Sequence, residues 1–276
     1  MTEFSIFSKA LYSSWCYLPA RKLIFDCGEG CATHIGNKLA DVENIFLTHT
    51  HGDHTLGLPS VIGCRNAGRG ISRNEETMDH NKPLRIYYPA DNNMGDMIKF
   101  LEGRYLSWLR YDLQFIPIEA GYDHALGNKT FVRAFNMAHQ NGKSTLGYVI
   151  YENRTRLKAE YKGQNIPALF KQGILRDQIN ESYRANIFAY CLDAYKINDP
   201  DQIKDCDAAI MDCTFINEAD RTDPTHFTLE EARKVCMGNG IKNMYAAHMS
   251  GRYDFNEVVK EYPDVHFINP FRVNQI

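Results

Sequence analysis

The stretch Asn44-Ile-Phe-Leu-Thr-His-Thr-His-Gly-Asp-His54 contains three histidines and one aspartate within six residues. Its apolar start, Asn44–Thr48, is typical of a buried strand, and the chain turns directly after it. We therefore expect four polar side chains to lie close together at the strand end: His49, His51, Asp53 and His54. Neutral imidazole and carboxylate suit Zn²⁺, with Mn²⁺ or Fe as alternatives.

These four side chains cannot all reach one tetrahedral ion, but they can serve two. We expect His49 and His51 to face one metal, and Asp53 and His54 to face the other. Two ions about 3.5–4 Å apart can share a hydroxide and stabilise both the attacking and the leaving oxygen of an in-line displacement. A lone histidine in a turn is usually only solvated or hydrogen-bonded, but the density of this motif argues against that interpretation.

Composition and charge limit the class of protein. The chain has 276 residues and a net charge of −3, which argues against a protein that coats nucleic acid through charge alone but leaves room for a local basic groove. The eight cysteines form no Cys-x-x-Cys pair, which favours free thiols in a reducing compartment. Neither a signal peptide nor a run of roughly 20 apolar residues is apparent, so we expect a cytoplasmic protein without membrane contacts.

Short apolar runs bounded by Gly, Pro, Asn or Asp predict ten strands. They are Lys22–Phe25, Asn44–Thr48, Leu84–Tyr88, Leu113–Ile118, Thr130–Asn136, Leu146–Tyr151, Ile187–Leu192, Ala208–Met211, Asn243–Ala246 and Val265–Ile268. Helical spacing predicts three helices, Met94–Leu109, Thr228–Met237 and Phe255–Glu261, the second opened by a capping box of Thr228 and Glu231. This alternation predicts one α/β domain over residues 1–276. Two polar segments without regular patterning, 66–82 and 153–183, are predicted to be surface insertions.

The His-x-His-x-Asp-His motif resembles the signature of the metallo-β-lactamase fold hydrolases. The resemblance implies an αβ/βα four-layer sandwich, in which two mixed sheets are flanked by helices. It also implies three further metal ligands, each after a predicted strand: His139, the bridging carboxylate Asp193, and His248. Asp26 matches a carboxylate that supports the histidine loop, although an aspartate that merely ends a strand accounts for it equally well.

Other motifs resemble tRNase Z in its compact form, an endonuclease that trims tRNA 3′ trailers. They are Gly52-Asp-His-x-x-Gly-Leu-Pro59, Ser144-Thr-Leu-Gly-Tyr148, Asp212-Cys-Thr-Phe215, Thr225-His-Phe-Thr-Leu-Glu-Glu-Ala232, His248-x-Ser-x-Arg-Tyr253 and Leu157-Lys-Ala-Glu-Tyr-Lys-Gly163, and the resemblance runs from about residue 11 to 262. In this pattern His226, held by the Asp212 carboxylate, is similar to a general acid for the leaving oxygen. The alternative is that His226 is only hydrogen-bonded to the helix cap at Thr228.

The sequence departs from this pattern in places that bear on the substrate. Ala194 stands where the family usually has Thr, and Asp212 stands where it usually has Glu. The Gly-rich opening strand of many members is missing. Long tRNase Z enzymes carry an arm with a Gly-Pro motif that grips the tRNA elbow, and residues 153–183 contain no Gly-Pro.

Three hypotheses for the function follow. The first is a zinc-dependent tRNA 3′-processing endonuclease that acts on the 3′ end of RNA, with two Zn²⁺ per chain, Asp53 orienting the nucleophile and His226 protonating the leaving group. The second is a phosphodiesterase for small cyclic nucleotides, favoured by the missing Gly-Pro and the acidic balance, because a small ligand needs no wide basic face. The third, a non-catalytic scaffold, is disfavoured by the complete ligand set.

The segment 66–82 follows the metal-binding loop and is predicted to begin near the mouth of the site. We expect phosphate contacts from Arg65 or Arg69 there, including contacts across a homodimer. Ser144, in its motif after His139, is a third candidate for substrate binding. The alternative is a solvated surface loop, which composition alone makes the more common outcome.

Overall fold

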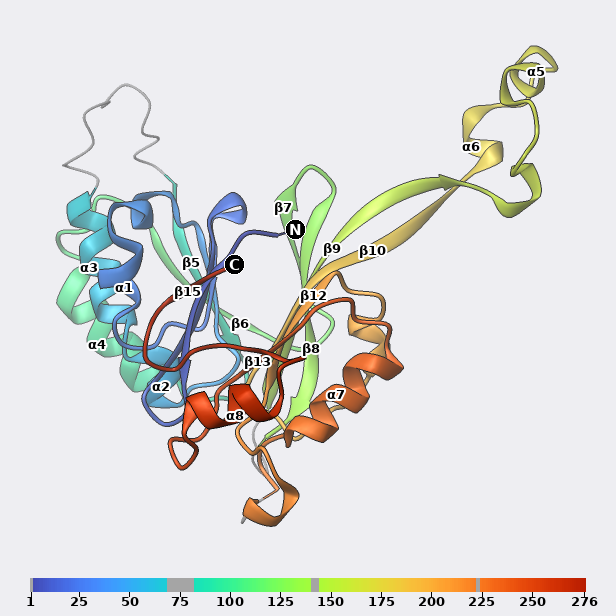
Figure 1. Cartoon of the computed structure of the whole chain (residues 1–276). Coiled ribbons are helices and arrows are strands. Elements are labelled where there is room, and N and C mark those ends of the chain that lie inside the picture. Colours follow the sequence, from blue (N-terminus) through green and yellow to red (C-terminus); the bar gives the residue numbers. More distant parts are fainter. Residues whose placement is uncertain (1, 69–81, 140–143, 222–223) are drawn as a thin grey trace.

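The computed structural model describes residues 2–68, 82–139, 144–221 and 224–276. Two mixed β-sheets pack face to face, and helices cover the outer face of each sheet (Figure 1). The layers therefore run helix, sheet, sheet, helix. The predicted αβ/βα sandwich of the α/β class is confirmed.

The first sheet combines an antiparallel N-terminal part with a parallel part that begins at β3. Its strand order is β15 (Asn274–Gln275), β1 (Ser5–Lys9), β2 (Ser13–Leu18), β3 (Leu23–Phe25), β4 (Asn44–Phe46), β5 (Leu84–Pro89) and β6 (Leu113–Ile118). Its outer face is covered by α1 (Cys31–Ile35), α3 (Leu58–Gly68) and α4 (Gly95–Tyr105), while the short α2 (Gly52–Thr55) follows the histidine loop. Parallel strands direct their carboxyl ends to one edge, which is where this loop begins.

The second sheet has the order β11 (Lys196–Ile197), β8 (Thr130–Ala138), β9 (Thr145–Leu157), β10 (Asn180–Cys191), β12 (Ala208–Asp212), β13 (Met244–Ala247) and β14 (His266–Phe267). β7 (Asp123–Gly127) pairs with β8 off this path. Its outer face is covered by α7 (Leu229–Gly238) and α8 (Phe255–Glu261). β10, β12 and β13 are parallel, so the loops that follow them share one edge.

Aromatic side chains fill the space between the sheets. Phe25 of the first sheet stacks on Tyr148 and Tyr190 of the second, with ring centroids 5.4 and 5.1 Å apart. All three rings are almost completely buried. Stacked rings of this size contribute about 0.5–1.5 kcal/mol per pair beyond the area they bury. They hold the two sheets in a fixed relation, and with them the strand ends that carry the polar loops.

Each predicted strand overlaps a strand of the structure, and all three predicted helices are present. Thr228 caps α7, and its capping box with Glu231 forms as expected. Five strands were not predicted: β1, β2, β7, β11 and β15. β11 and β15 are two residues long, too short to show a periodic pattern.

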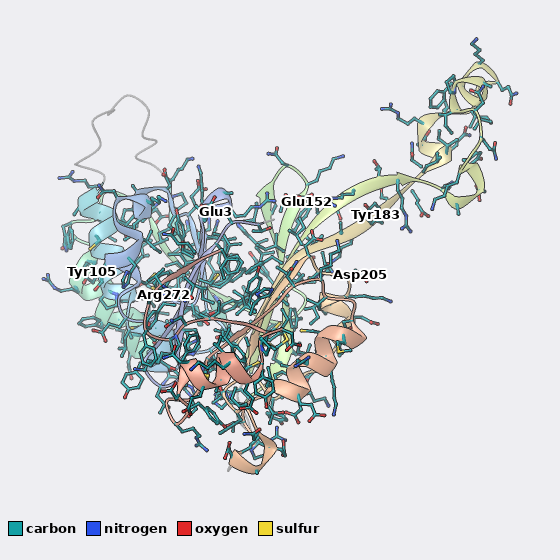
Figure 2. The ribbon with its side chains drawn as sticks, viewed as in Figure 1. Glu3, Tyr105, Glu152, Tyr183, Asp205 and Arg272 are labelled. Atoms are coloured by element: carbon teal, nitrogen blue, oxygen red, sulfur yellow. The ribbon has the colours of Figure 1, made fainter. Side chains whose placement is uncertain are left out.

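Residues 153–183, predicted to be a surface insertion, contain regular secondary structure that the sequence pattern did not indicate. β9 and β10 continue as an antiparallel pair to Leu157 and Asn180 and form an arm that projects from the molecule. Two helices at its tip, α5 (Ile166–Lys171) and α6 (Arg176–Ile179), follow the short 3-10 helix Ala159–Tyr161. Figure 2 labels Glu152 at the base of the arm and Tyr183 further along β10. We refer to residues 153–183 as the arm.

The arm escaped prediction because its strands have no buried face. Its side chains are mostly exposed, so no alternation of apolar and polar residues marks it. Backbone pairing and cross-strand contacts hold it instead, among them Arg156 with Glu181 at 2.7 Å and the Arg156 guanidinium over the Tyr183 ring. Cross-strand pairs of this kind contribute roughly 0.2–1 kcal/mol each.

The eight cysteines are free thiols, and all but Cys64 are buried. This agrees with the prediction that the chain contains no disulfide framework. Within the described residues, none of the helices has the length and apolar character needed to cross a membrane.

Candidate metal centre

Seven polar side chains from loops far apart in the sequence meet at one edge of the two sheets. His49 and His51 lie in the turn between β4 and α2, and Asp53 and His54 lie in α2 itself. The other three side chains follow strands of the second sheet: His139 directly follows β8, Asp193 lies two residues beyond β10, and His248 directly follows β13. Asp193 and His248 adopt left-handed backbone conformations, with φ of 54° and 63°. Non-glycine residues rarely adopt this conformation, and such residues cluster at functional sites.

These side chains form two groups that share Asp193. His49, His51 and His139 form one group with the Asp193 carboxylate, and Asp53, His54 and His248 form the other. Within each group the nitrogen and oxygen atoms lie within 4.8 Å of one another. The structure thus brings together all seven predicted ligands, in the division expected from the spacing of the histidine motif.

The donor set fits divalent metal ions. Four buried imidazole nitrogens, the Nε2 atoms of His49, His54, His139 and His248, have no hydrogen-bond partner among the described residues, and neither has Asp193 Oδ1. A buried polar atom without a partner costs about 1–3 kcal/mol, so five of them at one place need a ligand in common. Imidazole nitrogens and carboxylate oxygens in two groups of four are a typical donor set for zinc and related metals.

The opposite nitrogen of each imidazole is held by an outer partner. Nδ1 of His49 lies 2.9 Å from Thr48 Oγ1, Nδ1 of His139 lies 2.8 Å from the Thr225 carbonyl, and Nδ1 of His248 lies 2.8 Å from Thr214 Oγ1. Such partners fix the ring orientation and leave Nε2 free to bind a metal.

Asp26 is the outer partner of His54, at 2.8 Å from Nδ1. The carboxylate is completely buried and also accepts hydrogen bonds from Tyr190 Oη at 3.0 Å and from the backbone and hydroxyl of Thr48. These contacts favour the supporting role over an aspartate that merely ends a strand.

Burial and charge set the protonation of the site. Burial lowers the pKa of His49 and of His139, which keeps both imidazoles neutral and able to bind a metal. Burial disfavours the ionised form of Asp193, but the neighbouring His248 and His54 outweigh this effect and hold its pKa well below the usual range. The shared ligand is therefore a carboxylate.

His226 and Asp212 form the predicted dyad beside both groups. His226 Nδ1 lies 2.7 Å from Asp212 Oδ2, so the shorter aspartate still reaches its partner. The His226 ring lies 4.7 Å from that of His139 and 5.1 Å from that of His248. Burial lowers the pKa of His226, but the Asp212 carboxylate outweighs it and raises the pKa to about 9. A protonated imidazole is what a general acid requires.

Of the two arginines predicted to contact the substrate, the structure describes only Arg65. Arg65 is corrected, because its guanidinium is completely buried: Nε donates to the Val42 carbonyl at 2.9 Å, Nη2 donates to the Lys82 carbonyl at 3.0 Å, and the group covers the Tyr111 ring. It anchors α3 and is not accessible to a phosphate. Arg69 lies outside the described residues.

Asn92 connects Ser144 to the histidine loop by hydrogen bonds to both. The Ser144 carbonyl accepts from Asn92 Nδ2 at 2.9 Å, and Asn92 Oδ1 accepts from Thr50 between the first two ligand histidines. The Ser144 amide donates to Asp91 at 3.0 Å. The Ser144 backbone thus helps to hold the loop, and its contact with a substrate stays a prediction.

Sequence reasoning missed the outer partners Thr48, Thr214 and Tyr190. Thr48 and Thr214 stand inside the motifs, next to His49 and two residues after Asp212, so adjacency could have drawn attention to them. Tyr190 is 164 residues from Asp26 in the chain, and only the folded sheets bring the two together.

Fold and site together define this chain as a metallo-β-lactamase fold protein. Residues 12–116 match the model of the metallo-beta-lactamase superfamily. Seven side chains that could hold metal ions, in two groups at the edge of two facing sheets, agree with that match.

The more specific similarities are to ribonuclease Z. The chain is 26% identical to ribonuclease Z of Thermococcus kodakarensis, covering 87% of this chain and 78% of that protein. It is 27% identical to ribonuclease Z of Listeria monocytogenes, covering 84% and 79%. The structure is similar to that of human tRNase Z, short form, with a TM-score of 0.67, 18% identity, and coverage of 99% and 98%.

Proposed function

We propose that this protein is a metal-dependent phosphodiesterase that cleaves RNA at the 3′ side of precursor tRNA. The observation that carries the proposal is the His226–Asp212 dyad at 2.7 Å, placed beside two groups of metal ligands. Hydrolysis of a phosphodiester needs a proton on the departing oxygen, and this dyad is positioned to give it. The length of the similarity to ribonuclease Z supports tRNA as the substrate.

Divalent ions held by the two groups would supply Lewis acidity toward the phosphodiester and a nucleophile from water at neutral pH. The chain's own residues do the rest. His226 holds a proton that can pass to the leaving oxygen, while Asp212 fixes the ring through Nδ1. The side chain of His226 is 16% exposed, so a substrate can reach it. Asp53, on the rim of the second group, orients the nucleophile.

The arm favours RNA over a small cyclic nucleotide. The case for a small substrate depended on the absence of a Gly-Pro arm and on the acidic balance, and the chain has an arm, although without the Gly-Pro motif. Its end, residues 158–179, carries four cations against two anions: Lys158, Lys162, Lys171 and Arg176 against Glu160 and Asp177. A projecting basic element suits contact with a phosphate backbone away from the reaction centre.

The test is to offer the purified protein a precursor tRNA and a panel of cyclic nucleotides in parallel. We expect one cut at the 3′ side of the tRNA and little turnover of the cyclic nucleotides. Hydrolysis of a cyclic nucleotide with the tRNA left intact would contradict the proposal that tRNA is the substrate and would favour the small-substrate hypothesis. Zinc as the metal, two ions per chain, a homodimer and a cytoplasmic location belong to the same proposal and stay predictions.

A further inference from the structure

A cavity of about 610 Å³ lies at the end of the sheets opposite the metal centre. The amino-terminal ends of β4 and β5 form its floor, and β7 and the 3-10 helix Pro19–Arg21 form its walls. Figure 1 shows β7 and α2 at opposite ends of the molecule. The cavity is therefore separate from the site described above, and its volume lies within the range of about 300–1,000 Å³ of small-molecule sites.

Three cations line this cavity against one carboxylate. Arg21 donates to Glu152 at the base of the arm at 3.1 Å, and Lys22 donates to Glu43 at 3.4 Å. Arg85 on β5 forms no ion pair or hydrogen bond through its side chain with any described residue. Its guanidinium is a fork of donors that fits a phosphate or carboxylate in bidentate fashion.

The floor also contains a buried amide without a partner. Asn44, at the start of β4, is 5% exposed, and its Oδ1 atom is buried without a hydrogen-bond partner among the described residues. An unmet buried amide costs about 1–3 kcal/mol, and a bound ligand that hydrogen-bonds to it would recover this cost. Arg85 and Asn44 lie side by side, since Asn44 pairs with Arg85 in the sheet register.

Rings complete the lining. Tyr87 Oη and His124 Nδ1 form a hydrogen bond of 3.0 Å. The Tyr122 ring lies 5.8 Å from the Tyr87 ring, measured between centroids. Tyr122 and His124 are partly exposed to the cavity, while Tyr87 is buried. A planar group can stack on such rings.

We propose that this cavity is a second ligand site, which binds a small phosphate-bearing molecule of the nucleoside monophosphate class. Its phosphate lies against the Arg85 guanidinium, with Lys22 adding charge. A polar edge of the molecule meets Asn44, and its ring stacks beside Tyr122. The proposal requires nothing of the metal centre or of its substrate.

Calorimetric titration of the metal-loaded protein with AMP, adenosine and inorganic phosphate tests the site. We expect AMP to bind, phosphate to bind at least 10-fold more weakly, and adenosine to bind more weakly than AMP. Arg85→Gln should weaken AMP binding at least 10-fold, because it removes the bidentate contact. Arg104→Gln, on the exposed face of α4, removes the same charge elsewhere and should leave binding unchanged.

A metal-site variant separates this cavity from the metal centre. His51→Ala should retain the AMP binding that Arg85→Gln loses. Three results would overturn the proposal: no heat with AMP at millimolar concentration, binding that is insensitive to Arg85→Gln, or binding that disappears in His51→Ala. Circular dichroism of the Arg85→Gln variant shows whether a loss of binding reflects a loss of folding. Asn44→Ser, which retains a small polar group, provides a second variant should Arg85→Gln fail to fold.

Discussion

The hydrogen bonds of Asp212 determine whether His226 acts as a metal ligand or as a proton donor. Asp193, Asp212, His226 and His248 also lie within metal-binding distance of one another, so geometry alone permits His226 to be a ligand. However, Asp212 accepts four hydrogen bonds, from the Ala194 amide, from the amide and hydroxyl of Thr214, and from His226. A carboxylate has about four acceptor positions, so none remains for a metal. His226 is therefore better assigned to proton transfer.

Replacing His226 by Ala tests this assignment. We expect the turnover number on precursor tRNA to fall by a factor of about 10²–10⁴, with metal content unchanged. The loss should shrink for an aryl phosphodiester with a nitrophenolate leaving group, because that group departs without a proton. His51→Ala provides the contrast and should lose the ion of the first group together with the activity. Loss of metal from His226→Ala would instead make His226 a ligand.

Replacing Tyr190 tests whether the Asp26 carboxylate orients His54. Tyr190→Phe removes a hydrogen bond to the Asp26 carboxylate and should cost about 1.5–3 kcal/mol of unfolding free energy. Because Asp26 orients His54, metal affinity should also fall on the order of 10-fold.

Tyr148→Phe is the matched control for that variant. Tyr148 is equally buried and donates to the Leu47 carbonyl, so its variant loses a neutral hydrogen bond of about 0.5–1.5 kcal/mol. Stability measured by urea denaturation should fall in both variants, and metal affinity measured by competition with a chelator should fall only in Tyr190→Phe. Equal metal affinity in the two would remove Asp26 from its supporting role.

At the scale of elements, sequence patterns succeeded where a strand or helix has a buried face. β6 and α8 were predicted to the residue, because each joins a row of apolar side chains to turn or cap signals. The arm has no such face, and β2 is buried on both sides and shows no alternation. β1 alternates over only five residues, and the sequence analysis missed it. Alternation marks only elements that lie between core and solvent. The fully buried β3, β4 and β12 were predicted instead as short apolar runs bounded by turn residues.

Replacing residues 158–179 by a short Gly-Ser turn tests the arm. β9 and β10 already pair at Leu157 and Asn180, so the shortened hairpin should form and the thermal midpoint should change little. We expect the Michaelis constant for precursor tRNA to rise at least 10-fold, because the basic tip is lost. Hydrolysis of the aryl phosphodiester should stay the same.

A charge variant separates the basic charge of the tip from its shape. The quadruple replacement of Lys158, Lys162, Lys171 and Arg176 by Gln keeps the helices but removes the cations. It should reproduce most of the rise in the Michaelis constant, and its effect should diminish as salt is raised. Unchanged kinetics on tRNA in both arm variants would contradict a role of the arm in RNA binding.

For the whole molecule, the metal centre exists only in the assembled fold. Its candidate ligands span from His49 to His248, and Asp193 belongs to both groups. The local run of histidines and Asp53 could be predicted from spacing, because its members are neighbours in the chain. The distant candidate ligands followed only from a family resemblance. The contact of Tyr190 with Asp26 could not be predicted, since contacts between sheets leave no periodic trace in one sequence.

Metal removal should therefore destabilise the whole protein. Protein never exposed to a chelator should contain about two ions per chain by elemental analysis, and a chelator should lower the thermal midpoint. Each ion present at 1,000 times its dissociation constant stabilises the folded state by about 4 kcal/mol. Adding Zn²⁺ back should restore the midpoint. A reproducible content of one ion or fewer would contradict two full sites.

The division into two groups predicts how many metal ions each single variant loses. His51→Ala should empty the first group and His248→Ala the second, each leaving about one ion per chain. Asp193→Asn should weaken both, because its carboxylate serves each group and an amide carries no charge to balance two cations. His266→Ala, an exposed histidine on β14, should keep both ions. If His51→Ala and His248→Ala each lost both metals while Asp193→Asn lost neither, the ions would be held by a different set of ligands.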